Sequence, residues 1–300
     1  MKIDVVYSDK YYVDIGAHVF PTAKYRLIKE KLGKSAVIMN RIQFVEPHPA
    51  EEKDVLRVHE KSYLDKLRHG KLSHEEMLTL EMPYSKELFE SSLLCSGGTI
   101  CAAGSALEKG VAVHLGGGFH HAFPDHGEGF CVLNDIAVAI KKLINERKIK
   151  KALIIDCDLH QGNGTAFIFT GDKNVFTFSI HQENNYPFYK PKSDMDIGLH
   201  DRTKNAEYLE CLESRIPKII SDFKPQLIVY VAGADPYEND QIGNLGLTIE
   251  GLRKRDLFVY NQARNYGIPV AVVLAGGYAI NQDDTVEIHF NTVAQAAEIF

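Results

Sequence analysis

Residues 151–160 read Lys151-Ala152-Leu153-Ile154-Ile155-Asp156-Cys157-Asp158-Leu159-His160, and this stretch decides the fold class. Its first half is apolar on both faces, which is typical of a buried strand in a parallel sheet. In its second half a period of two places Asp156, Asp158 and His160 on one side of the chain. Buried acids need partners, so these residues predict a site at the end of the strand. A carboxylate and an imidazole two residues apart form a compact ligand pair for a metal ion.

Five further apolar runs have the length of strands, and helical patterns lie between them. The runs are Ile3–Tyr7, Val111–Leu115, Val175–Ile180, Leu227–Val231 and Val270–Leu274. This alternation predicts one α/β domain over residues 1–300, with a mostly parallel sheet covered by helices on both faces. The longest irregular stretches, residues 116–129 and 184–202, both follow strands, where α/β proteins place their sites.

Two helix starts carry capping residues. An apolar stripe with helical spacing runs from Leu133 to Ile144, and Asn134 or Asp135 can cap it. A second helix is expected to begin at Thr248, whose side chain is a candidate cap.

Composition and charge argue against several classes of function. The 300 residues are 45% hydrophobic and 25% charged, as in ordinary globular proteins. The net charge is −6 and no basic stripe occurs, so direct nucleic-acid binding is not expected. No apolar run approaches membrane-spanning length, and the start lacks the apolar core of a signal peptide. Five cysteines without a Cys-x-x-Cys spacing suit a reducing compartment. These features predict a cytoplasmic protein, and they leave its oligomeric state open.

Three more segments that follow strands join the one at residues 156–164. Gly116–His121 ends in two histidines, which are common general bases. Asp235 follows another strand and is the natural third metal ligand. Gly276-Gly277 precede Tyr278, whose hydroxyl can donate to a developing oxyanion. Taken singly, each has an ordinary explanation: a surface loop, an Asp-Pro turn and a packed aromatic side chain.

Taken together, the four segments contain the parts of a metal-dependent amide hydrolase. Two aspartates and a histidine leave an open position for water on a catalytic zinc ion. Zinc lowers the pKa of its bound water to about 7. The paired histidines transfer protons, and the tyrosine stabilises the oxyanion.

The same stretches resemble the zinc-dependent histone deacetylase family and occur in its order. They are GGGFHH at Gly116–His121, GEGFC at Gly127–Cys131, DCDLHQGNG at Asp156–Gly164, GAD at Gly233–Asp235 and GGY at Gly276–Tyr278. The first and third look most like the class IV branch and its bacterial relatives. The resemblance covers essentially the whole chain and implies the arginase–deacetylase fold, a single α/β domain whose mostly parallel sheet has about eight strands.

The resemblance also implies roles for the matching residues. Asp158, His160 and Asp235 would bind Zn²⁺, with Fe²⁺ as an alternative metal. His121 would be the general base and then the acid, while His120, hydrogen-bonded to Asp156, would act electrostatically. Tyr278 would polarise the acyl carbonyl.

One matching position departs from the class I pattern. Asn163 stands behind the second histidine, where class I enzymes have an aspartate. An asparagine can orient an imidazole but adds no negative charge, so His121 would be less basic here.

The family's substrate tunnel and cation site imply further residues. Phe130 would form one tunnel wall and Gly129 would line it closely, with Tyr186 or Phe188 as candidates for the opposite wall. His18 is a further candidate for the lining, with a simple loop histidine as the alternative. No residue matches the rim aspartate that grips the peptide backbone in class I enzymes. A structural K⁺ ion would be bound by groups from the following residues: Asp156 and Ser179 by their side chains, and Asp158, His160 and Ile180 by backbone oxygens.

The predicted function is zinc-dependent hydrolysis of an acyl-lysine amide in a protein or peptide. Alternatives are an acetylpolyamine or other small-amide hydrolase, a catalytically weak module that binds acyl-lysine, and a ureohydrolase with two manganese ions. The intact set of histidines, ligands and tyrosine favours an enzyme over a binding module. Pro236-Tyr237 after Asp235 favours one metal over two. The length of the acyl group and the nature of the protein substrate stay open.

Overall fold

Eight parallel strands form one sheet in this computed structural model, which describes residues 2–300. Their order across the sheet is β2-β1-β3-β8-β7-β4-β5-β6. The strands are β1 (Ile3–Val6), β2 (Ile42–Val45), β3 (Val111–His114), β4 (Ala152–Asp156), β5 (Val175–Gln182), β6 (Met195–Leu199), β7 (Leu227–Val231) and β8 (Val270–Val273). Every neighbouring pair is parallel, as expected for strands connected through helices.

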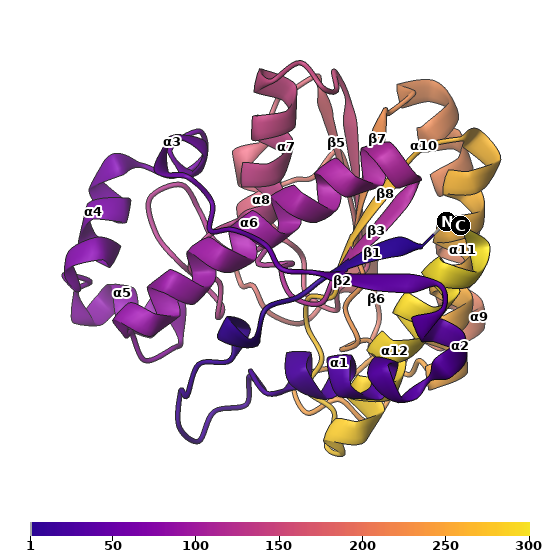
Figure 1. The fold of residues 1–300 in the computed structure, drawn as a ribbon, viewed down its shortest axis with the longest axis horizontal. Coiled ribbons are helices and arrows are strands. Elements are labelled where there is room, and N and C mark those ends of the chain that lie inside the picture. Colours follow the sequence, from indigo (N-terminus) through magenta and orange to yellow (C-terminus); the bar gives the residue numbers. More distant parts are fainter. Residues whose placement is uncertain (1) are drawn as a thin grey trace.

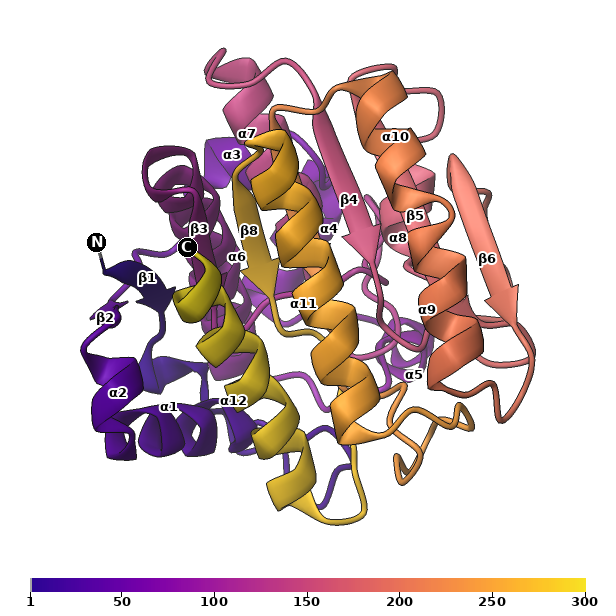
Figure 2. The same ribbon diagram turned by 90° about the vertical axis from the view of Figure 1, so that its right-hand side faces the viewer.

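Helices cover both faces of this sheet. Figure 2 shows α9 to α12 in front of the strands, and Figure 1 shows α6 to α8 on the opposite side and α3 to α5 beyond the start of α6. The helices are η1 (Asp9–Tyr11), α1 (Lys24–Lys34), α2 (Ala36–Met39), α3 (Glu52–Val55), α4 (Lys61–His69), α5 (His74–Leu80), α6 (Lys86–Lys109), α7 (Asp135–Asn145), α8 (Asn163–Ile168), α9 (Asn205–Glu213), α10 (Ile216–Phe223), α11 (Ile249–Tyr266) and α12 (Gln282–Ile299).

The central strands are buried on both faces, and alternate residues supply two hydrophobic cores. In β3, Val113 packs into the core under α11 and α12, whereas Ala112 packs into the core under α6 and α7. All residues of β3, β4, β7 and β8 are buried. The near-continuous apolar runs in the sequence follow from this two-sided burial.

The expected helix starts are confirmed. The side chain of Asn134 accepts a hydrogen bond from Ala137 N (3.0 Å) and so caps α7. Thr248 caps α11 in the same way, with its hydroxyl accepting from Gly251 N (3.0 Å). Asp135, the alternative cap, turns toward the Gly116–His121 loop instead.

Two strands were not predicted, and both form the edges of the sheet. β2 has only one buried residue, and β6 alternates between intermediate and exposed positions until its last residue. The expectation of an irregular stretch over residues 184–202 was wrong for Met195–Leu199, which form β6. An edge strand buries less apolar surface than a central one, so its apolar run is short or interrupted.

Strand order brings the four chemical motifs together. The motifs at residues 116–121, 276–278, 233–235 and 156–164 follow β3, β8, β7 and β4, which are consecutive neighbours in the sheet. Because parallel strands share one carboxyl edge, all four motifs meet at the same place.

Candidate active site

A buried cluster of Asp158, His160 and Asp235 has the geometry of a metal site. One ligand atom from each residue lies within 4.8 Å of the others. His160 Nδ1 is 3.1 Å from Asp158 Oδ1 and 3.3 Å from Asp235 Oδ2. All three side chains are buried, so their charges have little access to water. This is the only such cluster within residues 2–300.

Backbone groups hold the two carboxylates in place. Gly276 N donates to Asp158 Oδ2 (2.9 Å), and Leu159 N donates to Asp235 Oδ1 (3.0 Å). Gly276 is required here, because a Cβ atom at this position would lie 2.1 Å from Asp235 Oδ2. Asp235 Oδ2 is buried and accepts no hydrogen bond. A buried carboxylate oxygen without a donor fits a residue that coordinates a cation.

The charges of this cluster also call for a cation. Burial, together with the charge of Asp158, raises the pKa of Asp235 to about 7. Burial disfavours a charged imidazole at His160, but the neighbouring carboxylates of Asp158 and Asp235 outweigh it and raise its pKa to about 10. Two buried carboxylates thus favour a positive charge at this place, and a divalent ion such as zinc, bound by the two carboxylates and the neutral imidazole, would supply it.

Two adjacent histidines lie beside the metal cluster, each with its own partner. His120 Nδ1 lies 2.7 Å from Asp156 Oδ2, and His121 Nδ1 lies 2.7 Å from Asn163 Oδ1. The two Nε2 atoms are 3.1 Å apart, so one of them donates to the other. The hydrogen bonds are those that the sequence motifs lead one to expect; the catalytic roles stay predictions.

The partners give the two histidines opposite charge states. Burial opposes a charge on His120, but Asp156 and Asp158 outweigh it and raise its pKa to about 9. Burial, and then the charges of His120 and His160, hold the pKa of His121 well below its usual value. At neutral pH, His121 is therefore neutral and able to accept a proton.

Asp135 holds the loop that carries the histidine pair. Its carboxylate accepts from Gly118 N (3.0 Å) and Phe119 N (2.8 Å), and it also accepts from the Thr99 hydroxyl. Gly117 and Gly118 have positive φ angles of 71° and 83°, which glycine adopts at little cost. The sequence marked Asp135 only as a possible helix cap, because its contact with the loop depends on the fold.

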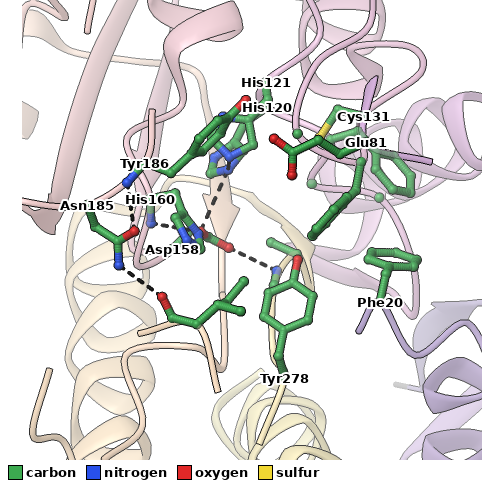
Figure 3. A pocket seen from close by; sticks show the side chains of 18 of the residues that line it. Phe20, Glu81, His120, His121, Cys131, Asp158, His160, Asn185, Tyr186 and Tyr278 are labelled. Carbon is green, nitrogen blue, oxygen red and sulfur yellow. Dashed lines mark hydrogen bonds and ion pairs between the residues drawn. The ribbon is translucent and has the colours of Figure 1, made fainter. Parts of the chain in front are cut away.

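Tyr278 points into the same space from the other side. Tyr278 N donates to Asp240 Oδ2 (2.7 Å), which fixes the backbone at the start of the residue. Figure 3 shows the ring rising beside Asp158 with its hydroxyl directed into the pocket. The phenol is therefore placed to donate a hydrogen bond to an oxygen near the metal cluster.

The sequence matches one family over most of its length. The model of the histone deacetylase domain matches residues 18–293. Histone deacetylase 2 of Arabidopsis thaliana is 30% identical to this chain, over 92% of the chain and 75% of the relative. The acetoin utilization protein AcuC of Staphylococcus aureus is 31% identical, over 92% of the chain and 77% of the relative. The chain belongs to the histone deacetylase family.

The structure agrees with this membership. The HDA15 HD domain has a TM-score of 0.82 and 20% identity, covering 99% of this chain and 88% of that domain. The predicted arginase–deacetylase fold is thereby confirmed, as a single domain with an eight-stranded parallel sheet. Membership of the histone deacetylase family implies a hydrolase that acts on amides. None of the helices between residues 2 and 300 is long and apolar enough to span a bilayer.

The pocket beside the Asp-His-Asp cluster is a cavity of about 180 Å³ with aromatic walls. Phe130 and Gly129 lie in its lining, as the resemblance implies, and so does Tyr186, one of the two candidates for the opposite wall. Phe188, the other candidate wall, is fully exposed and lies outside the lining. His18 does not line the cavity either: its ring packs edge-on behind Phe130, with centroids 4.9 Å apart.

Two charged residues near the pocket were not predicted from the sequence. Glu81 lies at its mouth with its carboxylate directed inward, and its positive φ of 55° is uncommon for a residue with a side chain. Lys24 is completely buried below the pocket, where its ammonium donates to Ala275 O (2.6 Å). Burial lowers the pKa of Lys24 to about 8, although Asp235 and Asp158 oppose this. No periodic pattern could have indicated either residue, since both reach the site through folding alone.

Two of the residues expected at the monovalent-cation site are neighbours in the sheet. Asp156 on β4 pairs in register with Ser179 on β5. The Ser179 hydroxyl lies 3.0 Å from His181 Nδ1, and Asp156 Oδ1 accepts from Asp158 N (3.1 Å). The potassium ion itself stays a prediction.

Proposed function

We propose that this chain is a zinc-dependent deacylase that removes acyl groups from lysine side chains of proteins or peptides. One observation carries the proposal: Asp158 and His160 of a buried Asp-His-Asp cluster, the neutral His121 and Tyr278 line one narrow cavity. We propose further that residues 1–300 form one catalytic domain. We also propose a cytoplasmic location, which five free cysteines suited to a reducing compartment support.

Asp158, His160 and Asp235 would hold the zinc ion. Bound there, zinc would polarise the acyl oxygen and lower the pKa of a water molecule to about 7. Fe²⁺ suits the same nitrogen and oxygen ligands and is the alternative metal.

The histidine pair would move the protons of the reaction. Neutral His121 accepts the proton of the attacking water at Nε2, because its Nδ1 is occupied by Asn163. His120, kept positive by Asp156, adds electrostatic stabilisation to the negative charge that develops nearby. His121 then gives the same proton to the lysine nitrogen as the C–N bond breaks, so the free amine leaves neutral and the acid remains.

Tyr278 and the tunnel walls would position the substrate. The phenol donates to the acyl oxygen as this oxygen gains negative charge. The rings of Phe130 and Tyr186 enclose the lysine methylenes, and Gly129 lets them pass close to the backbone. Glu81 would supply an acidic group at the pocket mouth, in place of the rim aspartate of class I enzymes, for which no match was found in the sequence. We assign the K⁺ site to the side chains of Asp156 and Ser179 and to backbone oxygens of Asp158, His160 and Ile180.

An acetylpolyamine is the second candidate substrate. Burial raises the pKa of Glu81, and the charge of the nearby Glu128 carboxylate raises it further. Two negative charges near the pocket mouth attract a substrate with a second positive charge. A polyamine fits this requirement, and so does a lysine in a basic peptide.

The test is hydrolysis of acyl-lysine peptides from acetyl to myristoyl, with acetylspermidine in parallel, each with and without a hydroxamate chelator. We expect the enzyme to hydrolyse the acyl-lysine peptides, and we expect the chelator to abolish this hydrolysis. Preference for acetylspermidine would replace the peptide substrate with a polyamine. Absence of turnover on every compound, with zinc bound by elemental analysis, would indicate a binding module.

The metal ligands are tested by Asp158→Ala. This variant should lose bound metal and all activity, because a carboxylate that coordinates the ion is removed. Asp194→Ala is the control, since Asp194 contacts Thr177 near the amino end of β5 and not the cluster. Full zinc occupancy in Asp158→Ala would show that the ligand set is wrong.

A further inference from the structure

Glu128 lies directly behind the asparagine that contacts His121. Its Oε1 accepts a hydrogen bond from Asn163 Nδ2 (2.7 Å) and another from the Tyr186 hydroxyl (2.7 Å). His126 Nε2 lies 3.5 Å from Oε2 of the same carboxylate. The chain His121–Asn163–Glu128 thus ends in a full negative charge, one residue farther from the imidazole than a directly bonded carboxylate would be.

A carboxylate at this position allows only one orientation of the Asn163 amide. Ionised Glu128 has no proton to donate, so it must face the NH₂ end of Asn163. The amide oxygen then faces His121 Nδ1, which must carry the proton of the neutral ring. His121 Nε2 is left with its lone pair directed toward His120 and the cavity, as a general base requires.

The opposite orientation would disable the same histidine. With its amide reversed, Asn163 would donate to Nδ1, and the ring proton would move to Nε2. A protonated Nε2 cannot take a proton from water. An asparagine alone can face Nδ1 with its oxygen or with its NH₂ group. An aspartate at this position could only accept a hydrogen bond from Nδ1. The carboxylate behind Asn163 removes this ambiguity.

The surroundings support an ionised Glu128. Burial favours the neutral acid, but hydrogen bonds from His126, Tyr186 and Asn163 outweigh it and lower the pKa of Glu128. The same carboxylate also holds the ring of Tyr186, whose centroid lies 5.0 Å from that of His121. Glu128 is outside the cavity lining and contacts Asn163, Tyr186 and His126, so any effect on His121 passes through these neighbours.

We propose that Glu128 is a positioning residue that fixes the proton of His121 on Nδ1 by orienting Asn163. The inference deepens the proposed function and rests on it for the role of His121 as general base. It explains how the chain keeps a working base with asparagine in place of aspartate: the negative charge lies behind the amide.

The first test is a set of three variants, measured with the zinc-loaded enzyme on an acyl-lysine peptide. Glu128→Gln removes the charge and can accept or donate, so both amide orientations become possible; kcat should fall about 10- to 100-fold, part of what a general base contributes. Asn163→Asp should also lower kcat, because it sets two carboxylates against each other. The double variant should recover at least about 5-fold over Glu128→Gln, since the carboxylate introduced at position 163 then orients His121 directly and accepts from the amide introduced at position 128.

The second test reads the proton itself and does not depend on activity. In ¹⁵N-histidine spectra of the zinc-loaded protein, His121 should show a protonated Nδ1 in the wild type and a growing Nε2-protonated fraction in Glu128→Gln. Zinc content and thermal unfolding are measured for every variant, and Glu213→Gln, at an exposed glutamate, is the matched control.

The outcomes separate the two proposals. A wild-type His121 protonated on Nε2, an unchanged spectrum in Glu128→Gln, or a double variant no better than either single one would overturn the role of Glu128. A wild type that shows the expected spectra but hydrolyses no acyl-lysine peptide would overturn the proposed function and leave the orienting role of Glu128 in place.

Discussion

Tyr278 is fixed through its backbone, which leaves its hydroxyl free for the substrate. Asp240 accepts from Tyr278 N, and the ring packs at centroid distances of 6.0 Å from Phe130 and 6.3 Å from Phe20. We therefore expect Tyr278→Phe to keep the fold and the metal while kcat falls about 10²–10³-fold, as when an oxyanion donor is lost. Steady-state kinetics and zinc analysis measure this, with Tyr189→Phe at an exposed tyrosine as control. Unchanged kcat would remove the tyrosine from the mechanism.

Gly129 combines a left-handed backbone with a crowded position in the tunnel. Its φ is 50°, and a Cβ atom would lie 2.8 Å from the Tyr186 hydroxyl and 2.9 Å from His121 Cδ2. Gly129→Ala should lower stability by about 1–2 kcal/mol through backbone strain and should also reduce kcat/KM by displacing the tunnel wall.

A second glycine separates these two effects. Gly171 has a φ of 74°, and a Cβ atom added there would meet no other atom within 4 Å, so Gly171→Ala should lose stability alone. Urea unfolding and peptide kinetics on both variants make the comparison. Equal activity in the two variants would argue against a tight tunnel wall at Gly129.

At the level of elements, Arg255 of α11 links the ends of the two strands that precede the proposed metal ligands Asp158 and Asp235. Its guanidinium is completely buried and donates from Nη1 to Cys157 O (3.2 Å) after β4 and to Gly233 O (2.6 Å) after β7. Asp256 balances its charge at 2.8 Å. The helix thus fixes the spacing between Asp158 and Asp235.

Arg255→Lys should weaken zinc binding about 10- to 100-fold, as loss of groups that orient metal ligands does. A lysine cannot reproduce the forked contact to two carbonyl oxygens. Zinc affinity is measured by competition with a chelator, at a temperature where urea unfolding shows the variant to be folded. Arg253→Lys on the exposed side of the same helix is the control. Wild-type zinc affinity in Arg255→Lys would show that the strands hold their spacing without this link.

The elements that the sequence predicted are those with a strong period. The six strands that were predicted have mostly apolar runs, interrupted only by single polar residues such as Asp4 and Thr177, and the capped helices have a clear stripe. β2 and β6 were missed because edge strands bury one face poorly. Asp135 was ambiguous for another reason: its use as a loop anchor depends on Gly118 N, which only the assembled sheet brings within reach.

For the whole molecule, parallel strand order explains why four separate motifs could be read as one site. The motif residues are local signals, and a shared carboxyl edge needs no detailed packing to be foreseen. Strand order could not predict three other residues near the site: Glu81, Lys24 and Glu128. Each is placed there by contacts between segments distant in sequence. Their positions follow from side-chain packing, which no spacing rule describes.

The stability of the whole fold should depend on buried neutral histidines, of which His59 is the clearest far from the metal cluster. Its Nε2 accepts from Asn134 N (2.9 Å), and burial lowers its pKa to about 4. Protonation would break that bond and place a charge in the core. The unfolded chain takes up this proton near pH 6.5, so the stabilisation is complete above pH 6.5 and is lost as the pH falls toward 4.

This shift corresponds to a loss of about 3 kcal/mol between the two pH values for His59 alone. His114, with a pKa lowered to about 3 by burial, should add to the loss in the same direction. The free energy of unfolding in urea at pH 7.5, 5.5 and 4.5 tests this. His59→Gln, whose amide oxygen can still accept from Asn134 N, should show a shallower decline than the wild type, and His200→Gln at an exposed histidine should not. If His59→Gln declined as steeply as the wild type, acid unfolding would have to begin at other groups.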